Sequence, residues 1–419
     1  MQSHRLHHLD WLRVIAFGLL VLFHTGMIFV PWRFHIQAAQ TSEMLMIVMS
    51  WMHAWRMPLL FLISGMGTAF ALGTRSGGAF IRQRVKRLLI PLLFGMFVVV
   101  PPQIYVERIA DYDSFWAFYP TVLALVPYPM GGSMSWHHLW FVLYLFFYSL
   151  ALLPLLLWVR RSSTRWSPAV YRWAHRGGLA WFFAPLFVLH AVTMPFFPEF
   201  THTLIDDWGR VVHFGMFFAA GFVIAVHPPI MARLRTKRRR HLMISVLWLV
   251  PFFAIRLFDW PTRPMLFGYD FLYWVPTSVV AWYFCLALLG YGYAALSRPS
   301  GLLTYLNDAV YPFYIWHQTV TVVLGAWVIH RVEGVALPFI LIAAGTYVGT
   351  LAIYHVLIRP YPFMRFLHGL KPRAADVSSP SRASASSASD LLVRTHLARR
   401  YRSTFLARAE IGASCKTED

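Results

Sequence analysis

The sequence predicts an all-α fold, a polytopic membrane bundle of about ten transmembrane helices with both termini in the cytoplasm. The first observation behind this prediction is composition: hydrophobic residues make up 58% of the 419 residues and charged residues only 13%. A soluble chain of this length needs more charged residues to cover its surface. The second observation is a set of ten apolar segments long enough to cross a bilayer. The third is the distribution of Arg and Lys between them.

The ten apolar segments follow one another along most of the chain. They lie at about 11–31, 44–72, 88–106, 138–158, 179–197, 210–227, 241–257, 271–296, 309–330 and 336–358. Each is apolar over roughly the 17 to 25 residues that a helix needs to cross the hydrocarbon core.

Arg and Lys alternate between the two sides of these segments. Connections 73–87, 159–178 and 228–240 contain five, five and six of them, and residues 359–419 contain eleven. The connections on the opposite side contain one each, as does connection 297–308. Because basic loops stay in the cytoplasm, both termini are predicted to be inside. This topology explains the formal net charge of +20, so we expect a lipid bilayer around the chain and no nucleic-acid partner.

The first span, LDWLRVIAFGLLVLFH, carries two basic side chains on one helix face. Arg13 and His24 are eleven residues apart, which is three helical turns plus about 20° and roughly 16 Å along the axis. Basic residues inside an apolar segment are costly and usually functional. The spacing suits a long ligand with an anionic head at Arg13 and a reactive end at His24.

The second and third spans carry further basic residues. His53 and Arg56 lie near the outer end of the second span, in SWMHAWRMPLLFLISGMG, and the small pair Ser64-Gly65 lies in its inner half. Small residues at such a position favour close helix packing. Arg84 and Arg87, in GGAFIRQRVKRLLIP, are predicted neighbours on one helix face. They could clamp phosphate through their guanidinium groups, or they could serve only as an inside-positive signal.

The connection 107–137 is rich in aromatic residues and leads into SMSWHHLW, which contains His138. Such aromatic residues either stack on sugar rings or anchor the chain at the membrane interface. In the ninth span, YPFYIWHQ places His317 about eight residues from the cytoplasmic end. Each of these histidines has an alternative interpretation as a core residue bonded to a backbone carbonyl.

The chain divides into a membrane domain, 1–370, and a basic tail, 371–419. Residues 374–390 are rich in Ser and Ala and low in complexity, so this tail is expected to be disordered or to lie on the membrane surface. Cys285 lies inside a span and Cys415 in the tail, so they cannot form a disulfide. We expect no metal site.

Taken together, these segments resemble the integral-membrane acyltransferase family known as acyltransferase type 3. The matching pieces are LDWLRVIAFGLLVLFH, MPLLFLISGMG, FIRQRVKRLLIP, HLWFVLYL and YPFYIWHQ, in the family's order over about residues 5–360. The first piece, HLWFVLYL and the ending YPFYIWHQTV look closest to the subgroup that succinylates osmoregulated periplasmic glucans. The resemblance implies transfer of an acyl group, succinyl or acetyl, from cytoplasmic acyl-coenzyme A to a carbohydrate hydroxyl. It also implies a multi-pass protein of the bacterial inner membrane with no tightly bound cofactor.

The resemblance also implies roles for individual residues. The residues matching His24 and Arg13 are essential in the family, and those matching Arg84 and Arg87 contribute to donor handling. We therefore expect His24 to be catalytic, as a base or as a covalent acceptor of the acyl group, with Arg13, Arg84 and Arg87 binding the donor. The candidate acceptor or supporting residues are His53, Arg56, His138 and His317.

Two other classes of protein share these features. A glycan or glycolipid transporter or flippase without acyl-transfer chemistry would also have many spans and charges within the membrane. A haem-b electron carrier could use buried histidines such as His24 and His317 as axial ligands.

The charge alternation predicts where reporter fusions will be found. A reporter fused within residues 107–137 should be periplasmic, and one fused after residue 371 should be cytoplasmic, because basic connections are retained inside. Paired alkaline phosphatase and fluorescent protein fusions measure this. A cytoplasmic reporter within 107–137 would contradict the arrangement.

Overall fold

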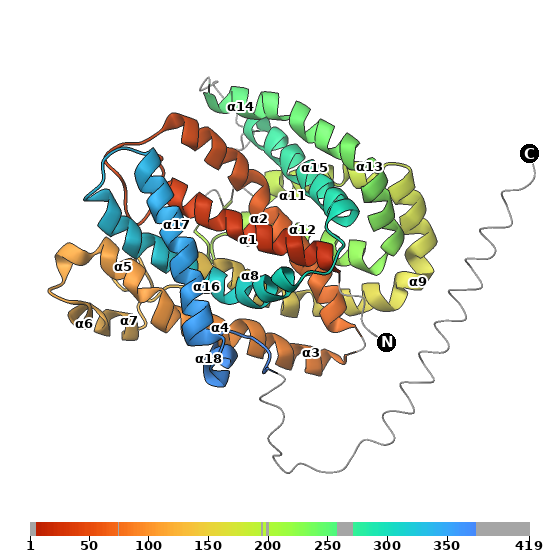
Figure 1. Ribbon diagram of the computed structural model, residues 1–419. Helices are drawn as coiled ribbons and strands as arrows, with labels where there is room; N and C mark the ends of the chain where they lie inside the picture. The colour runs from red at the N-terminus through yellow and green to blue at the C-terminus, as the bar shows by residue number, and fades with distance from the viewer. Residues whose placement is uncertain (1–5, 74, 194–195, 198–200, 258–270, 374–419) are drawn as a thin grey trace, which may run out of the picture. The chain divides into compact units, whose positions relative to one another are not determined.

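A computed structural model describes residues 6–373 apart from residue 74 and the segments 194–195, 198–200 and 258–270. Residues Leu6–Lys371 form one unit. The described part of the chain is helical and has no β-strand, which confirms the all-α prediction (Figure 1). The predicted tail from residue 374 onward lies outside the described residues, and the division of the chain at residue 370 stays a prediction.

The helices before the long aromatic connection are α1 (His7–Met27), α2 (Glu43–Leu72), α3 (Gly77–Arg84), α4 (Ile90–Phe94) and α5 (Pro101–Glu107). Two π-helical turns, Val85–Leu89 and Gly95–Val99, join α3, α4 and α5 into one continuous stretch. Turns of this kind are rare and are often found at functional sites.

The remaining helices begin within the aromatic connection. Short turns there are the 3₁₀ turn Ile109–Asp111, α6 (Phe115–Phe118), α7 (Pro120–Leu123) and the 3₁₀ turn His137–Leu139. The later helices are α8 (Trp140–Ala151), α9 (Leu153–His175), α10 (Gly178–Trp181), α11 (Phe183–Thr193), α12 (Trp208–Val226), α13 (Pro228–Leu247), α14 (Leu249–Leu257), α15 (Phe271–Ala295), α16 (Gly301–Ile329), α17 (Ala336–Ala352) with the π-helical turn Ile353–Ile358, and α18 (Pro362–Leu367).

Helices lie at all ten segments that were predicted to span the membrane. Among the described residues, seven helical stretches are long and apolar enough to cross a bilayer, or eight if α8 and α9, bent by 61°, form one span. The protein is therefore a multi-pass membrane protein. The count of ten and the side on which the termini lie stay predictions.

Two of the basic connections are themselves helical. Residues 159–178 lie largely in α9, and residues 228–240 lie in α13. These connections are helical because Arg and Lys are good helix formers. A helix that leaves the hydrocarbon core therefore need not end there. The apolar pattern locates the membrane-crossing part of such a helix but does not locate its end.

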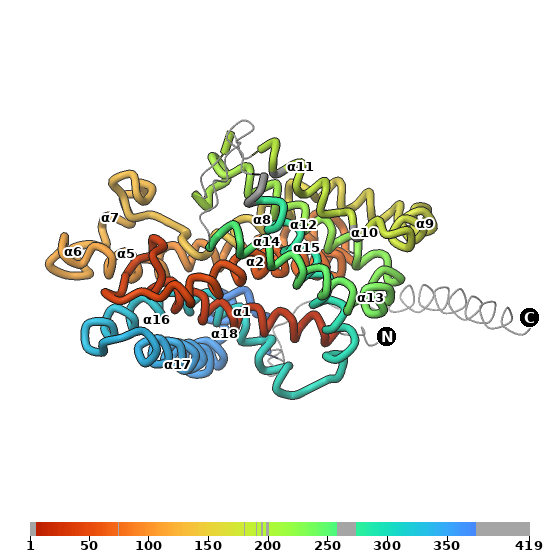
Figure 2. Tube along the Cα trace, turned by 90° about the horizontal axis from the view of Figure 1, so that it is seen from above, coloured from red at the N-terminus to blue at the C-terminus, as the bar shows by residue number. Residues whose placement is uncertain are grey.

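Helix α1 is central to the site and lies between α2 and α16 (Figures 1 and 2). It runs parallel to α16, because Arg13 bonds to Asn307 and, further along both helices, His24 meets His317. It runs antiparallel to α2, whose Arg56 covers the ring of Phe23.

Glycines allow α2 and α12 to approach at backbone distance. A Cβ atom added at Gly65 would lie 1.9 Å from the carbonyl oxygen of Phe218, and one at Gly221 would lie 1.9 Å from that of Leu62. Any larger side chain at either position must push the two helices apart. The packing predicted from the Ser64-Gly65 pair is confirmed, and it holds α2 against α12.

Candidate functional site

His24 of α1 faces His317 of α16 near the middle of the bundle. Their ring centroids lie 5.1 Å apart, and the ring planes are tilted by 50°. His317 is fully buried, and its Nδ1 lies 2.5 Å from the backbone carbonyl oxygen of Tyr314. Because a carbonyl can only accept, Nδ1 donates, and the lone pair of this imidazole is on Nε2.

Two ring nitrogens of this pair are buried without a hydrogen-bond partner, Nε2 of His317 and Nδ1 of His24. An unsatisfied buried polar atom is destabilising, so two of them at one contact indicate a site that binds a ligand or exchanges a proton. The backbone bond expected for a core histidine is present in His317. It occupies only one of the two ring nitrogens and leaves the other for chemistry.

The pair is too close to hold a haem group between its rings. A macrocycle bound by two axial histidines must lie between them, and rings 5.1 Å apart with a 50° tilt leave no space for it. This geometry disfavours the electron-carrier alternative for His24 and His317.

His138 completes a cluster of three histidines. Its ring centroid lies 5.3 Å from that of His317, with the planes nearly perpendicular. Nε2 of His138 donates to the carbonyl oxygen of Ile315 at 2.9 Å, and the hydroxyl of Tyr314 donates to the carbonyl oxygen of His138 at 2.6 Å. These bonds tie the start of α8 to the middle of α16.

A series of hydrogen-bonded polar side chains, led by two glutamines, continues from His138. Nε2 of Gln103 lies 3.4 Å from Nδ1 of His138 and donates to Oγ1 of Thr319 at 2.6 Å. Nε2 of Gln318 donates to Oε1 of Gln103 at 3.1 Å and lies 3.1 Å from Nε2 of His35. No sequence motif predicts Gln103, Gln318 or His35 as site residues. The available signal was the presence of two amide side chains within apolar segments, where polar groups are uncommon.

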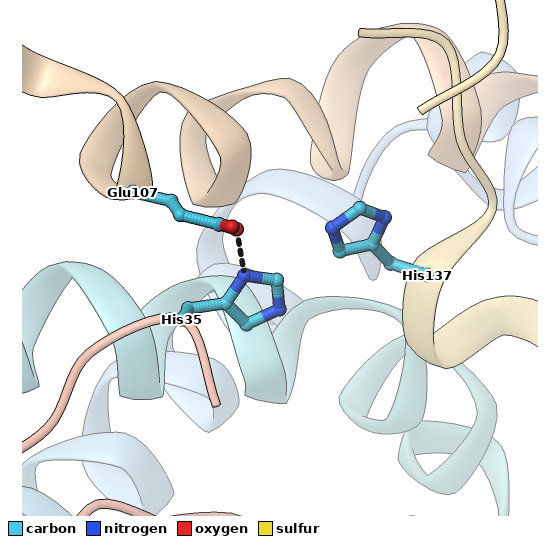
Figure 3. Close-up of side chains that lie close together, drawn as sticks. All are labelled: His35, Glu107 and His137. Carbon is cyan, nitrogen blue, oxygen red and sulfur yellow. Dashed lines mark hydrogen bonds and ion pairs between the residues drawn. The ribbon is translucent and has the colours of Figure 1, made fainter. Parts of the chain in front are cut away.

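This series of hydrogen-bonded side chains ends at Glu107, which the sequence also did not predict. Nδ1 of His35 and Oε2 of Glu107 lie 2.9 Å apart, and the ring of His137 stacks on that of His35 (Figure 3). The hydroxyl of Tyr128 donates to the other carboxylate oxygen of Glu107. Burial and this hydrogen bond raise the pKa of Tyr128 to about 12, so its hydroxyl remains a donor at neutral pH.

Three side chains in this region offer possible metal-ligand atoms within 4.8 Å of one another: His35, Glu107 and His137. Whether they could hold a metal ion depends on how the two imidazole rings are oriented. The two rings are nearly parallel, with planes 15° apart and centroids 4.8 Å apart. Their lone pairs therefore lie in parallel planes and cannot converge on one ion unless a ring turns. The geometry fits a hydrogen-bonded carboxylate–imidazole pair better than a metal centre.

Arg56 and His53 of α2 approach the same end of α1. The guanidinium carbon of Arg56 lies 3.6 Å from the centroid of the Phe23 ring, and the ring of His53 stacks on Phe23 at 5.8 Å. Phe23 immediately precedes His24, so Arg56 lies beside the His24–His317 pair. The structure thus gathers His24 and all four candidate supporting residues in one region.

Two of the predicted donor-binding arginines, Arg13 and Arg84, lie about three helical turns away, beside the C-terminal half of α2. Nη1 of Arg13 lies 3.3 Å from Oδ1 of both Asp10 and Asn307. Nη2 of Arg13 would lie 3.6 Å from a Cβ atom at Gly67, and Nη2 of Arg84 donates to Oγ1 of the next residue, Thr68, at 2.8 Å. Arg13 and Arg84 therefore flank one turn of α2.

The predicted spacing of Arg84 and Arg87 on a regular α-helix needs a correction. Arg84 ends α3, whereas Arg87 lies in the π-helical turn Val85–Leu89. A π-helical turn contains more residues than an α-helical turn, so three residues rotate the chain by less than the α-helical spacing assumes.

Residues 6–355 match the sequence profile of the acyltransferase type 3 family, described as an acyltransferase domain. Because the match covers most of the chain, the protein belongs to this family and is an acyltransferase, as the ordered motifs indicated.

Two relatives are both named glucans biosynthesis protein C. The chain is 23% identical over 382 residues to the protein from Salmonella paratyphi A, and 23% identical over 383 residues to the one from Salmonella typhimurium. Each match covers 88% of this chain and 95% of the relative. No solved structure matches the chain.

Proposed function

We propose that the protein transfers an acyl group, succinyl or acetyl, from cytoplasmic acyl-coenzyme A to a hydroxyl of a carbohydrate at the outer face of the bacterial inner membrane. The observation that carries this proposal is the pair of groups along α1, with Arg13 and its neighbours at one level and His24 with His317 at the other. The names of the two Salmonella relatives support a glucan of the cell envelope as the acceptor.

The inner group of arginines suits the donor. Coenzyme A carries phosphates at one end of a long narrow arm and a thioester at the other. Guanidinium groups match phosphate oxygens in charge and geometry, and Arg13 and Arg84 flank the same turn of α2. The arm is comparable in length to the offset of roughly 16 Å between Arg13 and His24. In this proposal acyl-coenzyme A is a substrate that enters and leaves, and no cofactor is tightly bound.

The histidine pair suits the reaction. His24 takes the proton of the acceptor hydroxyl as its oxygen attacks the thioester carbon, and the carbon–sulfur bond breaks to release the coenzyme A thiolate. The proton held by His24 then passes to that thiolate. His317 can offer only Nε2, an acceptor, because its Nδ1 is bonded to Tyr314. It can therefore orient His24 and stabilise its protonated form, as the third group of a catalytic triad does.

The opposite end of the site suits a carbohydrate acceptor. A series of hydrogen bonds leads from His138 to Glu107, at the start of the aromatic connection. It passes through Gln103, Gln318 and His35. Carboxylate, amide and imidazole groups bind sugar hydroxyls, and aromatic faces stack on sugar rings. A covalent route, in which His24 holds the acyl group before passing it on, uses the same contacts.

His24→Ala is expected to abolish acyl transfer while the protein remains folded in the membrane. Loss of a general base typically lowers the rate by about 10² to 10⁴, whereas alanine is well tolerated in a membrane helix. The measurement is mass spectrometry of envelope glucans from cells that express each variant as their only such enzyme. His7→Ala, at the other end of α1, is the control and should retain activity.

Wild-type acylation by a well-expressed His24→Ala protein would remove His24 from the chemistry. A transporter would give the converse pattern, in which wild-type cells differ from null cells in the location of the glycan and not in its acylation.

Neutralising Arg84 and Arg87 together, as a double Arg→Gln variant, should raise the KM for acyl-coenzyme A with a smaller effect on kcat. The reason is that a phosphate contact far from the thioester contributes equally to the ground state and the transition state. Initial rates with purified protein in nanodiscs measure the effect. The matched control is the double variant Arg82→Gln with Lys86→Gln, because both of these side chains are exposed in the same segment. An equal rise in KM in the control would mean that the effect comes from a general loss of positive charge and not from a specific phosphate contact.

A further inference from the structure

Arg56 is a buried cation without an anion. Its side chain is 3% exposed, and both Nε and Nη1 are buried without a hydrogen-bond partner. None of the carboxylates that the structure describes forms an ion pair with it. Its contact with the ring of Phe23, at 3.6 Å, is a favourable cation–π interaction, but it leaves the N–H donors unsatisfied.

Elsewhere the same fold supplies partners for a buried guanidinium. Arg365, which is 4% exposed, makes two bonds to the carboxylate of Asp308, at 2.9 and 3.2 Å, and donates to the carbonyl oxygen of Lys371. A charge buried inside a membrane protein without such a partner is strongly unfavourable and is a functional-site candidate. The contrast indicates that the partner of Arg56 is supplied by a ligand.

The position of Arg56 identifies which ligand can reach it. Arg56 covers Phe23, the residue next to His24, whose ring faces that of His317 at 5.1 Å. In the proposed function the donor phosphates lie at the other end of α1, beside Arg13 and Arg84. The part of that donor that meets Arg56 is therefore its acyl end, close to the carbon that is transferred.

We propose that Arg56 binds a carboxylate at the far end of the acyl chain and is therefore the residue that selects a succinyl donor over an acetyl donor. This inference rests on the proposed function and names the side chain that decides between its two acyl groups. A planar guanidinium matches a carboxylate through two parallel hydrogen bonds, and such bonds are strong where water is excluded. A neutral acyl group such as acetyl leaves the buried donors of Arg56 unpaired, which is an effective basis for rejecting it.

The test compares two donors on purified protein in nanodiscs, without an acceptor. Thermal unfolding and titration with succinyl-coenzyme A and acetyl-coenzyme A give the Kd of each for the wild type and for the variants Arg56→Gln and Arg56→Lys. Arg331→Gln, which removes an exposed arginine just beyond the end of α16, is the control. Initial rates with glucan extracted from cell envelopes then give KM and kcat for each donor.

Wild-type protein should bind succinyl-coenzyme A more tightly than acetyl-coenzyme A. Arg56→Gln should raise the Kd and KM for succinyl-coenzyme A by about tenfold or more and change those for acetyl-coenzyme A by less than about twofold. Arg56→Lys should retain part of the preference, because a point charge still attracts a carboxylate. Without ligand, the Tm of Arg56→Gln should not fall, since the cost of burying a charge without an anion outweighs its cation–π contact with Phe23.

Other outcomes overturn the inference in distinguishable ways. Equal weakening of both donors would assign Arg56 to a part that they share, such as the thioester oxygen. A lower Tm for ligand-free Arg56→Gln would assign it a structural role. Equal binding of both donors by the wild type would overturn the carboxylate site alone, whereas binding of neither donor would overturn the proposed donor as well.

Discussion

The parallel packing of α1 against α16 is the contact on which the rest of the site depends. It places Arg13 beside Asn307 at one level and His24 beside His317 at another. Further along, Gly325 of α16 makes room for Ile28, because a Cβ atom there would lie 2.9 Å from Cδ1 of Ile28. In an apolar bundle, polar side chains are stable where they meet each other or a ligand, so this alignment of two helices defines where chemistry can occur.

Helix α2 connects the two levels. It is held by the close glycine contacts with α12 and runs antiparallel to α1, so one helix brings Arg56 to the histidine pair and Thr68 to Arg84. A donor stretched along α1 would therefore lie against the same two neighbouring helices over its whole length. In the proposed function, this arrangement holds a phosphate-binding end and a reactive end at a fixed separation.

The sequence was informative wherever the evidence was local. Helical periodicity placed Arg13 and His24 on one face, and the Ser64-Gly65 pair predicted a close helix contact. The partnership of His24 with His317 could not be derived in this way, because the two residues are almost 300 positions apart and meet only through tertiary packing. The same holds for the bonds that join Gln103, Gln318 and His35. The π-helical turn at Arg87 was missed because a helical pattern does not show where an additional residue enters a turn.

The most direct test of this account is a cryo-electron microscopy structure of the protein in nanodiscs with a non-hydrolysable acyl-coenzyme A analogue. The account predicts phosphates beside Arg13 and Arg84, with the pantetheine arm along α1 and the acyl carbon next to His24 and His317. An analogue bound with its phosphates at the histidine end, or with its acyl carbon remote from His24, would contradict the account.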